Sequence, residues 1–385
     1  MTGYMSIIIQ KFGGKLLETP AKIRRAAELI VETKARRGDP VVVVSAPGKM
    51  TDRFVAMAQE ITPHPDEREM DMLLSVGERI AMSLLAMAIN AQGRYRAVSF
   101  TGSQVGIITD TRHTNARIIE VKGYRLKEAL ERGEIPIVAG FQGVSTEKEI
   151  TTLGRGGSDA TAVALATALK AERCELIKEC GSVRSADPSL VPETVPIPAM
   201  DYQTLESLSV SGAKIVQPAA AALARENKVT LAVIDISGTA GTVITDQPTQ
   251  MGSVAALVIE VDLALVEDGD RGRLKGAVPW VLFSEHSAKR LMVVKGKTEA
   301  LSKGNVVMIT IVGWGGSLDW EAIGKTESVL RTHRIRPIAK LGHKDRMTYL
   351  LPARIGVRVL KTLHQSLLEA GMIHRNSQPG QEGYF

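Results

Sequence analysis

Short apolar runs alternate with amphipathic stretches over roughly the first 245 residues of the chain. The runs are rich in β-branched residues, which favours buried strands, and they are SIIIQKF, VVVVSA, RAVSFTG, PIVAGF, CELIKE and VTLAVID. The stretches between them, such as PAKIRRAAELIVETKARR, carry apolar residues at helical spacing. This alternation predicts an α/β fold with a mostly parallel sheet, helices on both of its faces, and ligands at the carboxyl ends of the strands.

The pattern changes after the turn-rich passage DISGTAGTVITDQPTQMGS, which predicts one domain over residues 1–247 and a second region over 248–385. Residues 254–300 hold two apolar runs around a poorly patterned centre and predict a degenerate first module. Residues 305–372 predict the order strand, helix, strand, strand, helix. That order is the ferredoxin-like plan of small ligand-sensing or dimerising modules.

Composition narrows the functional classes. The chain has 385 residues and a formal charge of +6, but its basic residues are dispersed and aromatics make up only 4%, which disfavours nucleic-acid binding. No run of apolar residues approaches the roughly 20 residues that span a bilayer, and the N-terminus lacks signal-peptide features. A cytoplasmic protein without membrane contact is therefore expected. The two cysteines, without a neighbouring His or Cys cluster, indicate neither a disulfide framework nor a zinc site.

The most informative motif is TTLGRGGSDATAVALATAL, residues 151–169. Three glycines and Arg155 precede Ser158 and Asp159, which open a predicted helix. Backbone amides at a helix N-terminus bind anions, and an arginine adds a bidentate clamp. The alternative is that Ser158 or Asp159 merely caps the helix.

Two further loops follow predicted strands. Lys11 with Gly13 and Gly14 follows the first strand, and the loop from Ser45 to Thr51 follows the second. Because both loops fall at the same edge of a parallel sheet, we expect one shared site. Glu78 lies at the start of an apolar helix, where it either interacts with the helix dipole or receives the ammonium group of a ligand.

Taken together, these stretches resemble the aspartokinase branch of the amino acid kinase family. The resemblance rests on KFGG, SAPGKMTD, VGERIAMSLLAMAINAQG, TGSQVGIITDTRHTNARI, VAGFQGVSTEKEITTLGRGGSDATAVALA, RSADPSLV and SGAKIVQP, in the order of the family. It implies the carbamate-kinase-like three-layer αβα fold, followed by ferredoxin-like ACT domains. The ACT resemblance is clear for residues 305–372 and poor for 254–300.

The resemblance implies transfer of the γ-phosphoryl group of ATP, with Mg²⁺ carried by the nucleotide, to the side-chain carboxylate of L-aspartate or a close analogue, giving 4-phospho-aspartate. Lys11 and Asp159 would be catalytic. Nucleotide and phosphate contacts would come from Gly13, Gly14, Gly156, Gly157, Arg184 and Lys214. The amino acid substrate would contact Ser45, Thr51, Glu78, Arg155 and Ser158. No metal would be held by the protein itself, and the chain would form a homodimer through its ACT domains.

The departures from the family pattern concentrate on the nucleotide side. Where the family has T-D-V-D-G-V-Y-T-A-D-P-R, this chain has KECGSVRSADPS after the strand CELI, so Lys178 replaces a threonine, Arg184 a tyrosine and Ser189 an arginine. In addition, Lys15 replaces a threonine and Gln217 a histidine.

These departures leave four readings open. In the first, Lys15, Lys178 or Arg184 supplies the lost positive charge. In the second, the pocket holds a different phosphorylated or anionic partner, and the chain acts on another small carboxylate or amino acid with altered nucleotide use. In the third, catalysis is lost and a non-catalytic amino-acid-binding pseudokinase or a purely structural subunit remains. In the fourth, Lys15 simply faces solvent. Because the ACT region lacks the family's ligand segments, we also expect weak or absent feedback control by lysine or threonine.

Overall fold

The computed structural model describes residues 6–238, 240–247, 252–267, 279–284, 290–295 and 305–374. These residues belong to two compact units. The first consists of the chain up to Val183 together with Val216–Asp246, and the second of Arg184–Ile215 together with the chain from Gln247 onward.

The first unit is built on a sheet with the strand order β14-β13-β9-β1-β2-β6-β3. Neighbouring strands are parallel except for the antiparallel pair β13 and β14. The strands are β1 (Ile7–Phe12), β2 (Asp39–Val44), β3 (Ala97–Phe100), β6 (Ile135–Ala139), β9 (Arg173–Ile177), β13 (Leu231–Ile234) and β14 (Ala240–Thr245). The six predicted strands and the mostly parallel α/β sheet are thereby confirmed.

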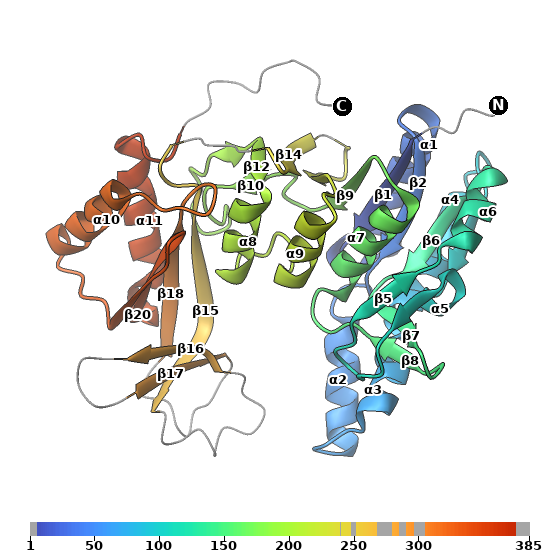
Figure 1. Cartoon of the computed structure of the whole chain (residues 1–385), viewed down its shortest axis with the longest axis horizontal. Coiled ribbons are helices and arrows are strands. Elements are labelled where there is room, and N and C mark those ends of the chain that lie inside the picture. Colours follow the sequence, from blue (N-terminus) through green and yellow to red (C-terminus); the bar gives the residue numbers. More distant parts are fainter. Residues whose placement is uncertain are drawn as a thin grey trace. The chain divides into compact units, whose positions relative to one another are not determined.

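Helices cover both faces of this sheet (Figure 1). On one face, α1 (Pro20–Arg36) and α4 (Val76–Asn90) pack against alternate strand residues such as Phe12, Val42 and Ile137. On the other, α7 (Gly157–Leu169) lies over β1 and β9 and contacts α9 (Pro218–Glu226). Because successive strand residues point to opposite faces, Lys11 faces α7 while Phe12 faces the α1 side.

The remaining elements of the first unit lie around this sandwich. A small sheet has the order β5-β4-β7-β8. Its strands are β4 (Ile107–Thr109), β5 (Ile118–Val121), β7 (Gln142–Ser145) and β8 (Ile150–Thr152), and the other helical segments are η1 (Gly14–Leu17), α2 (Met50–Ile61), α3 (Glu67–Leu74), α5 (Gly102–Val105) and α6 (Tyr124–Glu131). Thr19 caps α1 by accepting a hydrogen bond of 3.3 Å from the N–H of Lys22, and Pro20 opens that helix.

The second unit contains an antiparallel sheet with the order β16-β17-β15-β18-β20-β19. Its strands are β15 (Ala256–Glu267), β16 (Pro279–Ser284), β17 (Arg290–Lys295), β18 (Asn305–Val312), β19 (Ala339–Gly342) and β20 (Arg346–Pro352), and its helices include α10 (Trp320–Thr332) and α11 (Ala353–Glu369). The strand–helix–strand–strand–helix order expected over residues 305–372 is present. Between residues 254 and 300, the described positions form strands only, and their assignment as a degenerate module stays a prediction.

Residues 184–215 group with the second unit, although the sequence places them in a domain spanning 1–247. This segment contains β10 (Val183–Arg184), β11 (Pro196–Ile197), β12 (Ala199–Asp201) and α8 (Tyr202–Val210). Ser185 accepts a backbone hydrogen bond of 2.8 Å from Leu257 and its hydroxyl lies 2.8 Å from Nε2 of His364. Such contacts between distant parts of the chain leave no trace in local hydrophobic periodicity.

One helical stretch, Glu67–Asn90, is long and apolar enough to cross a membrane by length and composition alone. Half of its most apolar window is buried inside the protein. The buried side includes Ala81, Leu85 and Ile89, which belong to the hydrophobic core. A core helix of a globular protein meets the same criteria of length and apolar composition.

Candidate active site

The centre of the site is a buried ion pair between β1 and α7. The Nζ atom of Lys11 lies 2.6 Å from Oδ1 of Asp159, and both side chains are buried. Lys11 is the next-to-last residue of β1, and Asp159 lies in the first turn of α7. Buried ion pairs contribute little net stability because both charges lose their hydration. This pair is therefore better explained by binding or catalysis than by folding.

Asp159 remains ionised in this environment. Burial raises the pKa of Asp159, but the charges of Lys11 and Lys178, with hydrogen bonds from Lys11 and the backbone of Gln217, outweigh burial and hold that pKa below its usual value. A carboxylate with a lowered pKa is a poor proton acceptor at neutral pH. Asp159 therefore orients the Lys11 side chain and balances lysine charge, and it is unsuited to act as a general base.

The two predicted strand-end loops meet at this edge. The backbone N–H of Gly48 donates to the carbonyl of Gly14 over 2.9 Å, and the N–H of Ser45 donates to the carbonyl of Phe12 over 3.1 Å. A Cβ atom at Gly14 would lie 2.3 Å from the carbonyl oxygen of Ala46, so only glycine permits this approach. The two loops thus lie side by side at one edge of the sheet, and their contribution to one shared site stays a prediction. Thr51 lies in the first turn of α2 and is partly buried, as is Ser45.

Glu78 is buried at the start of α4 and keeps one carboxylate oxygen unused. Its Oε1 accepts the backbone N–H of Ala46 at 2.9 Å, whereas Oε2 has no hydrogen-bond partner among the described residues. Burial raises the pKa of Glu78 to about 7, against the opposing effects of its backbone hydrogen bonds and of Lys11. A dipole interaction at an exposed helix end requires neither burial nor an unpartnered oxygen. The geometry therefore favours the ligand-binding alternative.

The N-terminus of α7 differs from a capped helix. The helix begins at Gly157, and Gly156 precedes it with φ of +79° and no side-chain cap. The N-cap alternative for Ser158 and Asp159 is therefore wrong, because both lie inside the first turn. A Cβ atom at Gly156 would lie 1.9 Å from the side chain of Gln217, which explains glycine there. Ser158 is buried against Gly140 at the end of β6.

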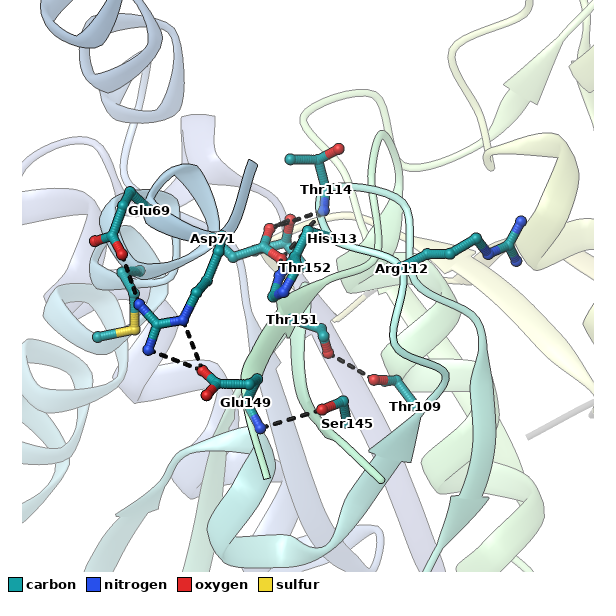
Figure 2. Close-up of polar contacts among 12 residues, drawn as sticks. Glu69, Asp71, Thr109, Arg112, His113, Thr114, Ser145, Glu149, Thr151 and Thr152 are labelled. Carbon is teal, nitrogen blue, oxygen red and sulfur yellow. Dashed lines mark hydrogen bonds and ion pairs between the residues drawn. The ribbon is translucent and has the colours of Figure 1, made fainter. Parts of the chain in front are cut away.

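Arg155 is exposed and forms no ion pair with any residue that the structure describes. The turn that carries it is supported by a polar network around Asp71 (Figure 2). The Asp71 carboxylate accepts hydrogen bonds from Thr152 Oγ1 at 2.5 Å and from the N–H of Thr114 at 3.0 Å, and lies 2.7 Å from His113 Nδ1.

This network fixes the loop formed by residues 113–115. Thr114 has φ of +59°, which is uncommon for a β-branched residue and needs support from its surroundings. The loop then packs on the turn before α7, because a Cβ atom at Gly154 would lie 2.9 Å from Oδ1 of Asn115. Asp71 is not among the predicted site residues; the available signal is an acidic residue within the otherwise apolar stretch MDMLL.

The remaining predicted cations have different positions. Lys15 is exposed, with 79% of its side-chain surface accessible, and lies 3.5 Å from Glu179. Arg184 and Lys214 belong to the second unit, and their phosphate contacts stay predictions. In that unit, Arg184 Nε donates to Thr194 Oγ1 over 2.6 Å. No group of three or more His, Cys, Asp or Glu side chains among the described residues is arranged to hold a metal ion.

The fold and site define a protein of the amino acid kinase family: residues 6–235 match the model of that family, and the chain belongs to it. Its curated relatives include the aspartokinases of Corynebacterium glutamicum (48% identical over 230 residues, 60% of this chain and 54% of the relative) and Geobacillus stearothermophilus (47% over 229 residues, 60% and 56%). The aspartokinase of Mycobacterium tuberculosis is 42% identical over 273 residues, 70% of this chain and 63% of the relative. The chain thus spans little more than half the length of these relatives.

Solved structures extend the likeness to the whole fold. E. coli aspartokinase III in complex with aspartate and ADP has a TM-score of 0.76 at 20% identity, covering 94% of this chain and all of that one. Aspartate kinase from Synechocystis has a TM-score of 0.58 at 29% identity, covering 98% of this chain and 71% of that one. The predicted α/β class is confirmed, and the ACT assignment of the second unit stays a prediction.

Proposed function

We propose that the chain transfers the γ-phosphoryl group of ATP to the side-chain carboxylate of L-aspartate, giving 4-phospho-aspartate and ADP. The observation that carries this proposal is the joint presence of the Lys11–Asp159 pair and the unpartnered Glu78 oxygen in loops that meet at one sheet edge. The site thereby offers a cation for phosphate and an anion for an ammonium group. The aspartokinase names of its relatives support the same reaction.

The chemistry requires little proton transfer. One oxygen of the substrate carboxylate attacks the γ-phosphorus, the bond from phosphorus to the bridging oxygen breaks, and ADP leaves with the electron pair. Because the attacking carboxylate is already ionised at neutral pH, no general base is needed. A permanently ionised Asp159 agrees with this reaction. Catalysis then depends on alignment and on charge stabilisation.

Lys11 would stabilise negative charge on the transferred group, and the ion pair with Asp159 would hold its ammonium group in position. The backbone of Gly13 and Gly14 borders the same space, since a Cβ atom at Gly13 would lie 4.0 Å from Nζ of Lys11. We assign Mg²⁺ to the nucleotide phosphates, where it would neutralise charge on the β- and γ-oxygens.

Glu78 would receive the ammonium group of aspartate through Oε2. Arg155 and Ser158 would contact the substrate carboxylates, with Ser45 and Thr51 lining the pocket. Arginine suits this role because its planar donors pair with a carboxylate in a bidentate manner. The proposal also includes a cytoplasmic location, in keeping with a small-molecule substrate.

A hydroxylamine-trapping assay with ATP, Mg²⁺ and L-aspartate tests the proposal, because hydroxylamine converts an acyl phosphate into a stable hydroxamate. We expect hydroxamate from wild type and a loss of at least a hundredfold in Asp159→Asn, which removes the charge that holds Lys11. Other amino and dicarboxylic acids run in parallel identify a different acceptor. A folded wild-type protein that binds aspartate yet forms no hydroxamate from any acid would contradict the proposal and indicate a binding protein.

A further inference from the structure

Lys178 follows β9 directly and lies beside the Lys11–Asp159 pair. In the parallel pair of β1 and β9, Lys11 is opposite Leu176 and Phe12 is opposite Ile177. The N–H of Lys178 donates to the carbonyl of Ile234 over 2.9 Å, so the ladder continues through this residue. By strand alternation, Lys178 faces the same side as Leu176 and Lys11, which is the side that α7 covers with Asp159.

Positive charges outnumber negative charges around Lys178, since Lys11 and Lys178 lie near the single carboxylate of Asp159. Asp159 is engaged by Lys11 at 2.6 Å, and Lys178, which is partly buried, forms no ion pair with any residue in the described part of the chain. Burial, aided by the positive charge of Lys11 and opposed by Asp159, lowers the pKa of Lys178 to about 8. Two lysines share one carboxylate, so the cluster carries an excess positive charge that an anion would neutralise.

The other groups near Lys178 do not supply that anion. On β9 the same face carries Cys174, whose pKa burial raises, so the thiol stays neutral. Glu179, the next residue along the chain, extends toward Lys15 at the surface. Glu78 on α4 influences Lys11 and binds the backbone of Ala46.

Three cations could replace the family arginine whose position Ser189 occupies, and they differ in their contacts. Lys15 is exposed and pairs with Glu179. Arg184 donates hydrogen bonds to the hydroxyl and the carbonyl of Thr194. Lys178 alone among these three shares Asp159 with Lys11.

We propose that Lys178 binds a phosphate group of the nucleotide beside Lys11, so that nucleotide binding in this chain depends on a lysine that must be protonated. This inference rests on the proposed function only in assuming that the site accepts a nucleotide. Because the bound anion favours the charged lysine, binding near pH 8 is expected to draw in up to about half a proton per ADP. Replacement of the family's threonine by lysine thus changes the way in which phosphate is held.

Calorimetric titration of the full chain with ADP and Mg²⁺ at pH 8, in two buffers of different ionisation enthalpy, measures this proton uptake. Wild type is expected to show uptake, and Lys178→Met is expected to lose it and to bind ADP roughly ten- to a hundredfold more weakly. Lys178→Arg is the decisive control, because arginine keeps the charge but does not titrate: binding should persist without uptake. Lys15→Met, which removes an exposed lysine, should resemble wild type.

Equal uptake in wild type and Lys178→Arg, or unchanged affinity in Lys178→Met, would overturn the inference. Glu78 is intact in all these variants, so any proton that it contributes cancels in the comparison. Thermal melting of each variant checks folding, and Lys178→Met should melt at or above the wild-type temperature because it removes a partly buried charge that competes with Lys11 for the carboxylate of Asp159. The hydroxamate assay distinguishes the two proposals. If proton uptake depends on Lys178 but wild type forms no hydroxamate, only the proposed reaction is refuted. If wild type forms hydroxamate but Lys178→Met binds ADP normally, only this inference is refuted.

Discussion

Glu78 and Asp159 are both buried carboxylates, yet their pKa values are displaced in opposite directions. For both residues burial is the largest single effect, and it raises the pKa. The pKa of Asp159 is nevertheless lowered because Lys11 lies at 2.6 Å and Lys178 adds a second positive charge. Glu78 has backbone hydrogen bonds and only a weaker effect of Lys11, which do not outweigh burial. The two carboxylates therefore differ in their partners: Asp159 pairs with lysine ammonium groups, whereas one oxygen of Glu78 has no hydrogen-bond partner among the described residues and is the atom that we propose binds the substrate.

This difference predicts a pH-dependent affinity for aspartate. With a pKa of about 7, Glu78 is protonated below that pH and cannot pair with an ammonium group, so aspartate affinity should rise by up to about tenfold per pH unit toward pH 7 and level off above it. Calorimetric titration from pH 5.5 to 8.5 measures the slope. In Glu78→Gln, binding should be weaker and flat with pH; a persistent slope in that variant would assign the titration to another group.

The same substitution provides a check on stability. Because the folded-state pKa of Glu78 is raised from 4.5 to about 7, the native protein retains a proton that the unfolded chain releases, and stability falls as pH rises through this window. Glu78→Gln removes that loss and should raise the free energy of unfolding at pH 8 by about 2 kcal/mol. A lower melting temperature for the variant at pH 8 would contradict this sign.

At the scale of elements, α3 and the small sheet determine the position of the turn that carries Arg155. Asp71 on α3 reaches β8 through Thr152 and the loop of residues 113–115 through Thr114, and that loop packs on Gly154. The contacts join residues more than 40 positions apart in sequence. The substrate contacts that we propose for Arg155 would thus depend on a buried carboxylate in a neighbouring helix.

Asp71→Ala is expected to lower the free energy of unfolding by about 3 kcal/mol, since it leaves the hydroxyl of Thr152 and the N–H of Thr114 without an acceptor. It should also raise KM for aspartate more than it lowers kcat, because Arg155 loses its support while the Lys11–Asp159 pair remains. Glu149→Gln is the matched control: Glu149 pairs with exposed Arg68 in the same region, and its loss should change stability by less than about 0.5 kcal/mol. Equal effects of the two substitutions would contradict a special role for Asp71.

The sequence predicts the elements of the large sheet well because β1, β2 and β9 each contain a cluster of apolar residues and are bounded by polar turns. It also places Lys11 and Asp159 in one site through the family resemblance. The burial of Lys178 could not be predicted, because it depends on the pairing of β9 with β1, which are separated by more than 150 residues. The hypothesis that Ser158 or Asp159 caps α7 was wrong for a related reason. Gly156 precedes this helix and contacts Gln217, which is about 60 residues away in the sequence, and local helix propensity does not reveal such a contact.

At the scale of the whole molecule, the second unit carries the predictions on assembly and regulation. We expect a homodimer through this unit, measured as twice 41.5 kDa by light scattering. We also expect no micromolar binding of lysine or threonine in calorimetry, because the segment IAKLGHKDR stands where the family often has a ligand segment. Clear micromolar binding of either amino acid would show that feedback control is retained.

The chain crosses between the two units three times, after residues 183, 215 and 246. A gene that ended at residue 247 would therefore encode Ser185 and Ser207 without His364 and Asp345, to which they are hydrogen-bonded. Recombination at a single point cannot exchange one unit for another without separating such partners. Deleting the region after residue 247 would therefore remove the hydrogen-bond partners of Ser185 and Ser207. If feedback control is absent, as we expect, substitutions inside the second unit are the change that preserves these contacts.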